Sequence, residues 1–162
     1  MDGFDTHADQ VSTGPSAGRH AAPLLELGQA TAALQAAING LGVSNAVTAF
    51  TQSDFGRTFL PNQSVGTDHD WGTDHGWRTH QLVMGGSVKG KTTYCTGPQL
   101  AWGGADDVGT QAWELQGGWI PTSSVDQYAA SLLRGFGASE GQLDATLPNL
   151  LDFGSMRGLA FL

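Results

Sequence analysis

Histidine and aspartate side chains are concentrated in one short stretch of this sequence. Residues 66–80 read GTDHDWGTDHGWRTH, where a six-residue unit, Gly-Thr-Asp-His-x-Trp, occurs twice in tandem and His80 follows. Three of the five histidines in the chain lie in this stretch. Imidazole and carboxylate ligands without thiolates suit zinc, manganese or iron. The stretch is therefore a candidate site for a divalent metal ion.

The same stretch also has an interpretation that needs no metal. Aspartates in glycine-rich loops bond their own backbone and form turns. The repeat can also be a slippage duplication, in which one copy is functional and the other is not. Spacing alone leaves the two interpretations about equally favoured.

The predicted elements around this stretch suggest how its side chains are positioned. A helix is expected from His20 to Gly42, and residues 46–51 and 81–84 are each typical of a short strand. A helix leading into a buried strand is half of a parallel α/β crossover. Ligands of open α/β sheets sit beyond the carboxyl ends of the strands. This rule predicts one crevice that gathers candidate metal ligands from three parts of the chain: Asp5, His7, Asp54, Asp74, His75 and His80.

The remainder of the chain is predicted to be irregular and then helical. Residues 92–122 are rich in glycine, threonine and tryptophan and read as irregular with short strands. A capping box at Ser124 and Gln127 predicts a second helix, and a similar cap at Ser139 predicts a short helix through Leu147. His20 is expected to cap or pack a helix start and not to bind a metal.

Composition and charge exclude several classes of protein. The formal net charge is −8 with only seven basic residues, which argues against a nucleic-acid partner. No apolar run is long enough to cross a bilayer, and the acidic opening residues do not form a signal peptide. Cys95 is the single cysteine, so no internal disulfide is possible. The polar cluster Asp5-Thr6-His7 opens the chain with no element before it, which suggests that residues 1–162 are one segment of a larger domain.

One motif is a false match to a nucleotide site. Residues 85–92, GGSVKGKT, fit the phosphate-loop pattern. That loop needs a helix to start directly after it, so that amides and helix N-terminus point at phosphate. Residues 93–98, TYCTGP, are β-branched, aromatic and then a turn, and predict no helix.

Several motifs in order resemble one bacterial family. GFDTHADQ, a His-led amphipathic helix, VTAFTQSDFGRT, GTDHGWRTHQLVMGGSVKG and IPTSSVDQYAASLLRGFG resemble the C-terminal part of the domain-of-unknown-function family DUF1501. The family is placed in the alkaline phosphatase and sulfatase superfamily. The resemblance implies part of an α/β/α sandwich around a mostly parallel sheet, with the N-terminal half missing. It also implies a periplasmic or extracellular location, through a twin-arginine export signal in the missing part.

The resemblance carries expectations about individual residues. Asp5 and His7 match the acidic motif that follows a strand, Asp54 matches the strand-end aspartate, and Asp74, His75 or His80 would supply the later histidine. The superfamily has histidine directly after the strand-end aspartate, whereas this chain has Phe55. Either the Asp74-His75 pair substitutes for it or one metal site is lost.

Two further residue assignments follow. The copy at residues 72–77 continues into the strand as in the family, so Asp68 and His69 of the first copy are the weaker candidates. Arg57 is expected to pair either with a substrate anion or with a carboxylate of the site.

These observations lead to two functional hypotheses. The first is a segment of a metal-dependent hydrolase, most simply with zinc and alternatively with manganese or iron, that acts on a small phosphate or sulfate ester. The nucleophile is expected in the missing half, so the segment alone should be inactive. The alternative is a non-catalytic exported module that keeps the fold and binds a metal or glycan. The replacement of histidine by Phe55 favours the alternative.

Overall fold

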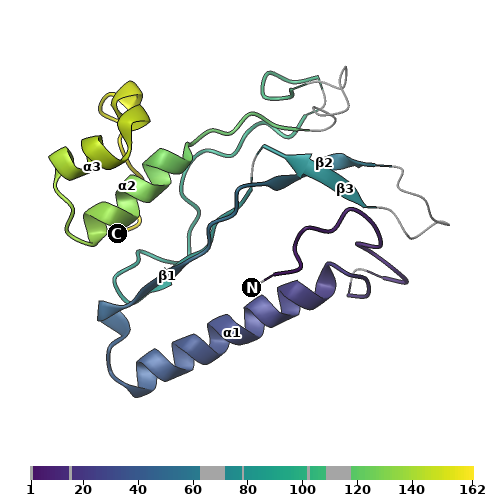
Figure 1. Cartoon of the computed structure of the whole chain (residues 1–162), viewed down its shortest axis with the longest axis horizontal. Coiled ribbons are helices and arrows are strands. Elements are labelled where there is room, and N and C mark those ends of the chain that lie inside the picture. The colour runs from purple at the N-terminus through teal and green to yellow at the C-terminus, as the bar shows by residue number, and fades with distance from the viewer. Residues whose placement is uncertain (1, 15, 63–71, 78, 102, 109–117) are drawn as a thin grey trace.

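The computed structural model describes residues 2–14, 16–62, 72–77, 79–101, 103–108 and 118–162. Three α-helices, four strands and two short 3₁₀ helices are assigned within these residues (Figure 1). In chain order they are α1 (Ala21–Gly40), η1 (Ser44–Ala46), β1 (Thr48–Phe50), β2 (Gly56–Pro61), β3 (Thr73–Gly76), β4 (Val83–Gly85), α2 (Val125–Gly135), α3 (Glu140–Thr146) and η3 (Pro148–Phe153).

The strands form two separate two-stranded sheets, both antiparallel. β1 pairs with β4, with Thr48 opposite Gly85, and β2 pairs with β3, with Gly56 opposite Gly76. The predicted partial α/β/α sandwich with a mostly parallel sheet is therefore wrong. A parallel pair needs one strand before the crossover helix and one after it. In the described residues before α1 no strand is present, so β1 pairs instead with the strand to which the chain returns.

β2 and β3 both lie in the part of the chain that connects β1 to β4, so the β2–β3 pair is nested within the β1–β4 pair along the sequence. In space, the β2–β3 pair extends away from the β1–β4 pair (Figure 1). β2 and β3 have no counterpart among the strands predicted from the sequence. The predicted strands at residues 46–51 and 81–84 correspond to β1 and β4.

Helix α1 is present where it was predicted, but its apolar stripe is mostly open to solvent. Only Pro23 and Ile38 are buried, whereas Leu24, Leu34 and Leu41 are 50 %, 40 % and 75 % exposed. The N-terminal segment runs between α1 and the β2–β3 hairpin (Figure 1). His20 packs edge-on against Phe4 with ring centroids 6.3 Å apart, and its ring Nδ1 lies 3.2 Å from the Thr6 hydroxyl. This confirms the expectation that His20 is a packing residue.

The C-terminal helices pack around a small core of their own. Ala130 of α2, Leu143 of α3 and Leu150 of η3 are fully buried against one another. Both predicted capping boxes are present: the Ser124 side chain accepts from the backbone of Asp126 and Gln127, and the Ser139 side chain accepts from that of Gln142. The local start signals therefore placed both helices correctly.

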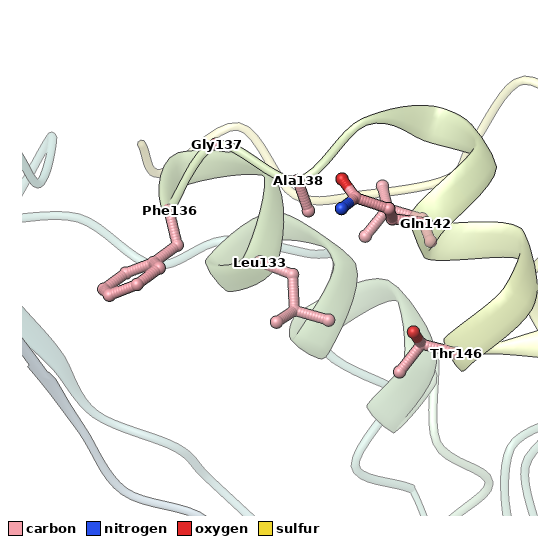
Figure 2. Close-up of a pocket in the computed structure, with 7 residues that line it drawn as sticks. Leu133, Phe136, Gly137, Ala138, Gln142 and Thr146 are labelled. Carbon is pink, nitrogen blue, oxygen red and sulfur yellow. The ribbon is translucent and has the colours of Figure 1, made fainter.

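A cavity of about 300 Å³ lies between α2 and α3, with Leu133, Gln142 and Thr146 among its lining residues (Figure 2). The ring of Phe136 points away from these side chains and is 95 % exposed. Phe136 is the C-cap residue of α2 and lies outside the group that this helix buries, which is Gln127, Tyr128, Ala130 and Ser131.

Side chains of α2 contact both the end of β1 and the C-terminal segment. The Tyr128 hydroxyl donates to the Thr51 carbonyl at 2.9 Å, and Gln127 donates to the Met156 carbonyl. Among the helices that the structure describes, none has the length and apolar content to span a membrane, as the sequence predicted.

Candidate metal centre

The N-terminal segment lies directly on the β2–β3 hairpin. The Arg57 guanidinium donates to the Phe4 carbonyl and, at 3.0 Å, to the Thr73 carbonyl, so it connects the segment to β3. The Asn62 amide donates to the His7 carbonyl at 2.9 Å. At Gly72 the fit is so close that an added Cβ would lie 1.9 Å from the His7 carbonyl oxygen. The hairpin thus fixes the backbone on which Asp5 and His7 are carried.

Asp5, His7 and His75 come together at this contact. Asp5 Oδ1 lies 2.7 Å from His75 Nε2 and 2.9 Å from His7 Nε2. The two imidazole rings are 4.8 Å apart between centroids. The candidate ligand atoms of the three residues all lie within 4.8 Å of one another, and all three side chains are exposed to solvent. Residues almost seventy positions apart in the chain therefore form one compact cluster.

A second layer of polar contacts holds His7 in place. His7 Nδ1 lies 3.1 Å from Asp74 Oδ1, and the same oxygen accepts from the Asn62 amide at 3.0 Å. The backbone N–H of Asp74 donates to the Thr58 hydroxyl at 3.1 Å. A neutral imidazole carries only one N–H, whereas both nitrogens of His7 face carboxylates. His7 satisfies both partners either as an imidazolium or with another cation between Nε2 and Asp5.

The carboxylates of the cluster are stabilised in their charged form. The hydrogen bond from His75 holds the pKa of Asp5 below its ordinary value, with His7 and Arg57 adding to the effect. The hydrogen bond from Asn62 does the same for the pKa of Asp74, and His7 contributes. Both groups therefore remain anionic acceptors across the neutral range.

The chemistry and spacing of the three donors fit a transition-metal ion. Two imidazole nitrogens and one carboxylate oxygen are ligands that zinc, iron and manganese share. Bonds of about 2.1 Å at tetrahedral angles place ligand atoms roughly 3.3 Å apart. The Asp5–His7 and Asp5–His75 distances of 2.9 and 2.7 Å need to widen by only about half an ångström to reach that value. Three protein ligands leave at least one coordination position open, as in catalytic zinc sites.

Phe55 and Arg57 form one side of the cluster. The Phe55 ring stacks on the His75 imidazole, with centroids 4.0 Å apart and an interplanar angle of 13°. The Arg57 guanidinium carbon lies 4.9 Å from the centroid of the same Phe55 ring. Arg57 is also 3.7 Å from Asp5 Oδ1, which corresponds to the carboxylate pairing that the sequence left open.

The structure brings only some of the predicted ligands together. Asp5, His7 and His75 form the cluster, and Asp74 contacts it through His7. Asp54 and His80 are not members; both line a separate cavity of about 1,330 Å³, whose lining includes residues 52–54, 79–83, 88–98 and 121–125. Asp68 and His69, from the first copy of the repeat, lie outside the described residues.

Sequence reasoning missed three residues that shape the cluster. Asn62 and Gly72 had no assigned role, and Phe55 was noted only as a departure from the superfamily's pattern. Thr58 and Phe59 in GRTFLP, which are residue types enriched in strands, could have indicated β2 and with it the hairpin that presents Asn62. Nothing in the sequence indicates the close approach of Gly72 to His7.

The phosphate-loop match has no structural counterpart. Residues 91–101 contain no helix. The backbone N–H groups of Gly86, Val88, Lys89 and Gly90 all donate to carbonyls of this chain. They are therefore not directed at a phosphate.

Comparison with known proteins gives one match. The sequence profile of the family described as "Protein of unknown function (DUF1501)" matches residues 1–112. This range contains every residue of the cluster and of its supporting hairpin. No curated protein matches, and no solved structure matches.

Proposed function

This chain belongs to the DUF1501 family, and we propose that its Asp5–His7–His75 cluster binds a divalent metal ion used in phosphate or sulfate ester hydrolysis. Zinc is the first choice of ion, with manganese or iron as alternatives. The hydrolytic part of the proposal draws on the resemblance to the alkaline phosphatase and sulfatase superfamily. The metal-binding part draws on the cluster itself.

The observation that carries the proposal is the arrangement around His7. A metal-binding histidine characteristically directs its second ring nitrogen to a carboxylate, which fixes the ring and raises its basicity. His7 has this arrangement, with Nε2 toward Asp5 and Nδ1 toward Asp74, and Asp74 is itself held by Asn62. Solvent-exposed ion pairs typically contribute only about 0–1 kcal/mol to stability, so stability alone gives little reason for such an arrangement.

Each residue then has a defined task. Asp5, His7 and His75 would hold the ion, Asp74 and Asn62 would orient His7, and Arg57 would keep a positive charge beside Asp5. A bound divalent ion polarises an ester oxygen and stabilises charge that develops during hydrolysis. The exposure of the cluster leaves room for an ester to approach it.

Metal analysis by mass spectrometry tests the proposal directly. The purified chain should contain stoichiometric transition metal, and a His7→Ala/His75→Ala variant should lose it. His80→Ala is the matched control, because His80 lies outside the cluster, and it should keep the metal. Absence of metal from the wild-type chain, even after incubation with zinc, would disprove the proposal. Hydrolysis of p-nitrophenyl phosphate and p-nitrophenyl sulfate is then measured with and without metal in a longer protein that contains this chain, because the segment alone is expected to be inactive.

One feature favours a second candidate, a non-catalytic module in which the metal is structural. The ligands connect the N-terminal segment to β3, so a bound ion would also hold these two parts of the chain together. Binding energy at such a site adds to folding stability. Removal of metal would then lower the melting temperature, while neither ester is hydrolysed even by a longer protein that contains this chain.

A further inference from the structure

We infer that the cluster holds one metal ion and not two, because Arg57 supplies the second positive charge beside Asp5 and Phe55 covers the adjacent face of His75. This inference rests on the proposed function. It concerns this chain's own residues and the number of ions that they admit.

Arg57 is held in a fixed position next to the shared carboxylate. Its guanidinium lies 3.7 Å from Asp5 Oδ1, and its side chain is only 18 % exposed. Hydrogen bonds to the carbonyls of Phe4 and Thr73 prevent it from swinging away. A guanidinium stays charged in proteins, so a second divalent ion on this side of Asp5 would meet a fixed cation at close range.

Phe55 occupies the face of His75 from which another metal ligand would have to approach a second ion. Its ring lies nearly parallel to the His75 imidazole at 4.0 Å and carries no lone pair. Asp54, the preceding residue, lines the separate large cavity and not the cluster. The segment that follows β1 therefore places the apolar Phe55 ring at the position where a second ion would need a ligand atom.

The carboxylate of Asp74 already has hydrogen-bond partners. Asp74 Oδ1 contacts His7 Nδ1 and accepts a hydrogen bond from the Asn62 amide, so Asp74 supports His7 and is not free to bind a second ion. Among the described residues, no other histidine, cysteine or acidic side chain joins the group of three. Three ligands suffice for one ion with an open position and are too few for two.

The charge balance leads to the same conclusion. With one divalent ion, the positive charge of the ion and Arg57 exceeds the negative charge of Asp5 and Asp74 by a single unit. A second ion would raise that excess to three units in a small space. With one ion, the net charge of +1 at the cluster favours a bound anion, such as the phosphoryl or sulfuryl group of an ester.

Zinc stoichiometry tests the inference without any measurement of activity. The wild-type chain is equilibrated with buffered zinc, and bound metal is counted by mass spectrometry. One ion per chain is expected. Two ions would overturn the inference and leave the proposed function standing, whereas none would overturn both.

A gain of binding tests the two named residues. Phe55→His together with Arg57→Gln restores a donor and removes the fixed cation, so this variant should bind a second zinc at the same free concentration. Phe136→His is the matched control, because Phe136, the C-cap residue of α2, is 95 % exposed, and it should still bind one ion. A double variant that keeps its circular dichroism spectrum and still binds one ion would overturn the roles assigned to Phe55 and Arg57.

Discussion

His7 is the residue where the two halves of the candidate site meet. Its ring lies between two carboxylates that come from different parts of the chain, Asp5 beside it and Asp74 from β3. The sequence analysis named all three residues as candidate metal ligands, from their residue types, the predicted crevice and the family resemblance. It did not predict that Asp74 would support His7 instead of acting as a ligand itself, since that depends on which side of β3 each side chain faces.

Replacing Asp74 by Asn should weaken metal binding without abolishing it. The amide keeps the shape of the side chain but removes the negative charge that His7 Nδ1 contacts. Loss of such an outer partner typically costs about 10–100-fold in metal affinity. Competition with a zinc-sensitive dye would measure the change, and Asp152→Asn, at an exposed position on η3, is the control expected to keep the wild-type affinity. Complete loss of binding would instead make Asp74 a direct ligand.

Replacing Gly72 by Ala should disrupt the contact between the N-terminal segment and the hairpin. The added Cβ would lie 1.9 Å from the His7 carbonyl oxygen, so one of the two backbones must move. Forced overpacking of this kind costs about 1–3 kcal/mol. We expect a lower urea midpoint together with weaker zinc binding.

Gly97→Ala is the control for this substitution, because a Cβ at Gly97 would have no atom within 4 Å. It should leave both the urea midpoint and the zinc affinity close to wild type. If Gly72→Ala behaved like Gly97→Ala, the N-terminal segment would not be packed on the hairpin as described.

At the scale of elements, the sequence predicted best those structures that local residues specify. Ser124 and Ser139 each start a helix with a capping box, and the structure has both helices with the predicted caps. β2 and β3 were missed because their pairing joins residues that are apart in the chain and surround a glycine-rich stretch. Short strands of this kind depend on their partner more than on their own composition.

Replacing Ser124 by Ala should destabilise α2 and the helical core around it. The Ser124 side chain accepts hydrogen bonds from two backbone N–H groups that have no partner inside the helix. Loss of such a cap typically costs about 0.5–2 kcal/mol. Urea unfolding should show this loss, while Ser155→Ala, at an exposed turn position, should change stability by less than about 0.5 kcal/mol. An unchanged midpoint for Ser124→Ala would mean that α2 does not depend on its cap.

At the scale of the whole molecule, the predicted parallel sheet is wrong, although some of the residues that it was expected to gather lie together. The prediction required strand ends on one edge of a sheet to gather Asp5, Asp54 and His75 together. In the structure, Asp5, His7 and His75 converge because the N-terminal segment lies across an antiparallel hairpin, and Asp54 faces elsewhere. The motifs that resemble the family include the three residues that the structure brings together. The long-range pairing that positions these residues could not be predicted from local sequence patterns.

The stability of the metal-free protein should fall in two stages as the pH is lowered. Burial, with Arg57 nearby, lowers the pKa of His20 below its ordinary value of 6.5, so the unfolded chain takes up a proton there more readily than the folded one. Stability is therefore fully present above about pH 6.5 and declines as the pH falls below it. Arg134 holds the pKa of Glu140 below its ordinary value of 4.5, so a second loss begins as the pH falls below about 4.5.

Melting temperatures measured from pH 8 to pH 3 in the presence of a chelator test this two-stage dependence. His20→Gln should remove much of the decline between pH 7 and pH 5, because glutamine does not titrate. Glu140→Gln should leave that first decline intact and flatten the second, which extends below pH 4.5, where Asp5 and Asp74 also protonate. The two substitutions act in separate parts of the molecule, so their effects should add. A first decline that persists unchanged in His20→Gln would place the responsible proton on another group and contradict the buried environment assigned to His20.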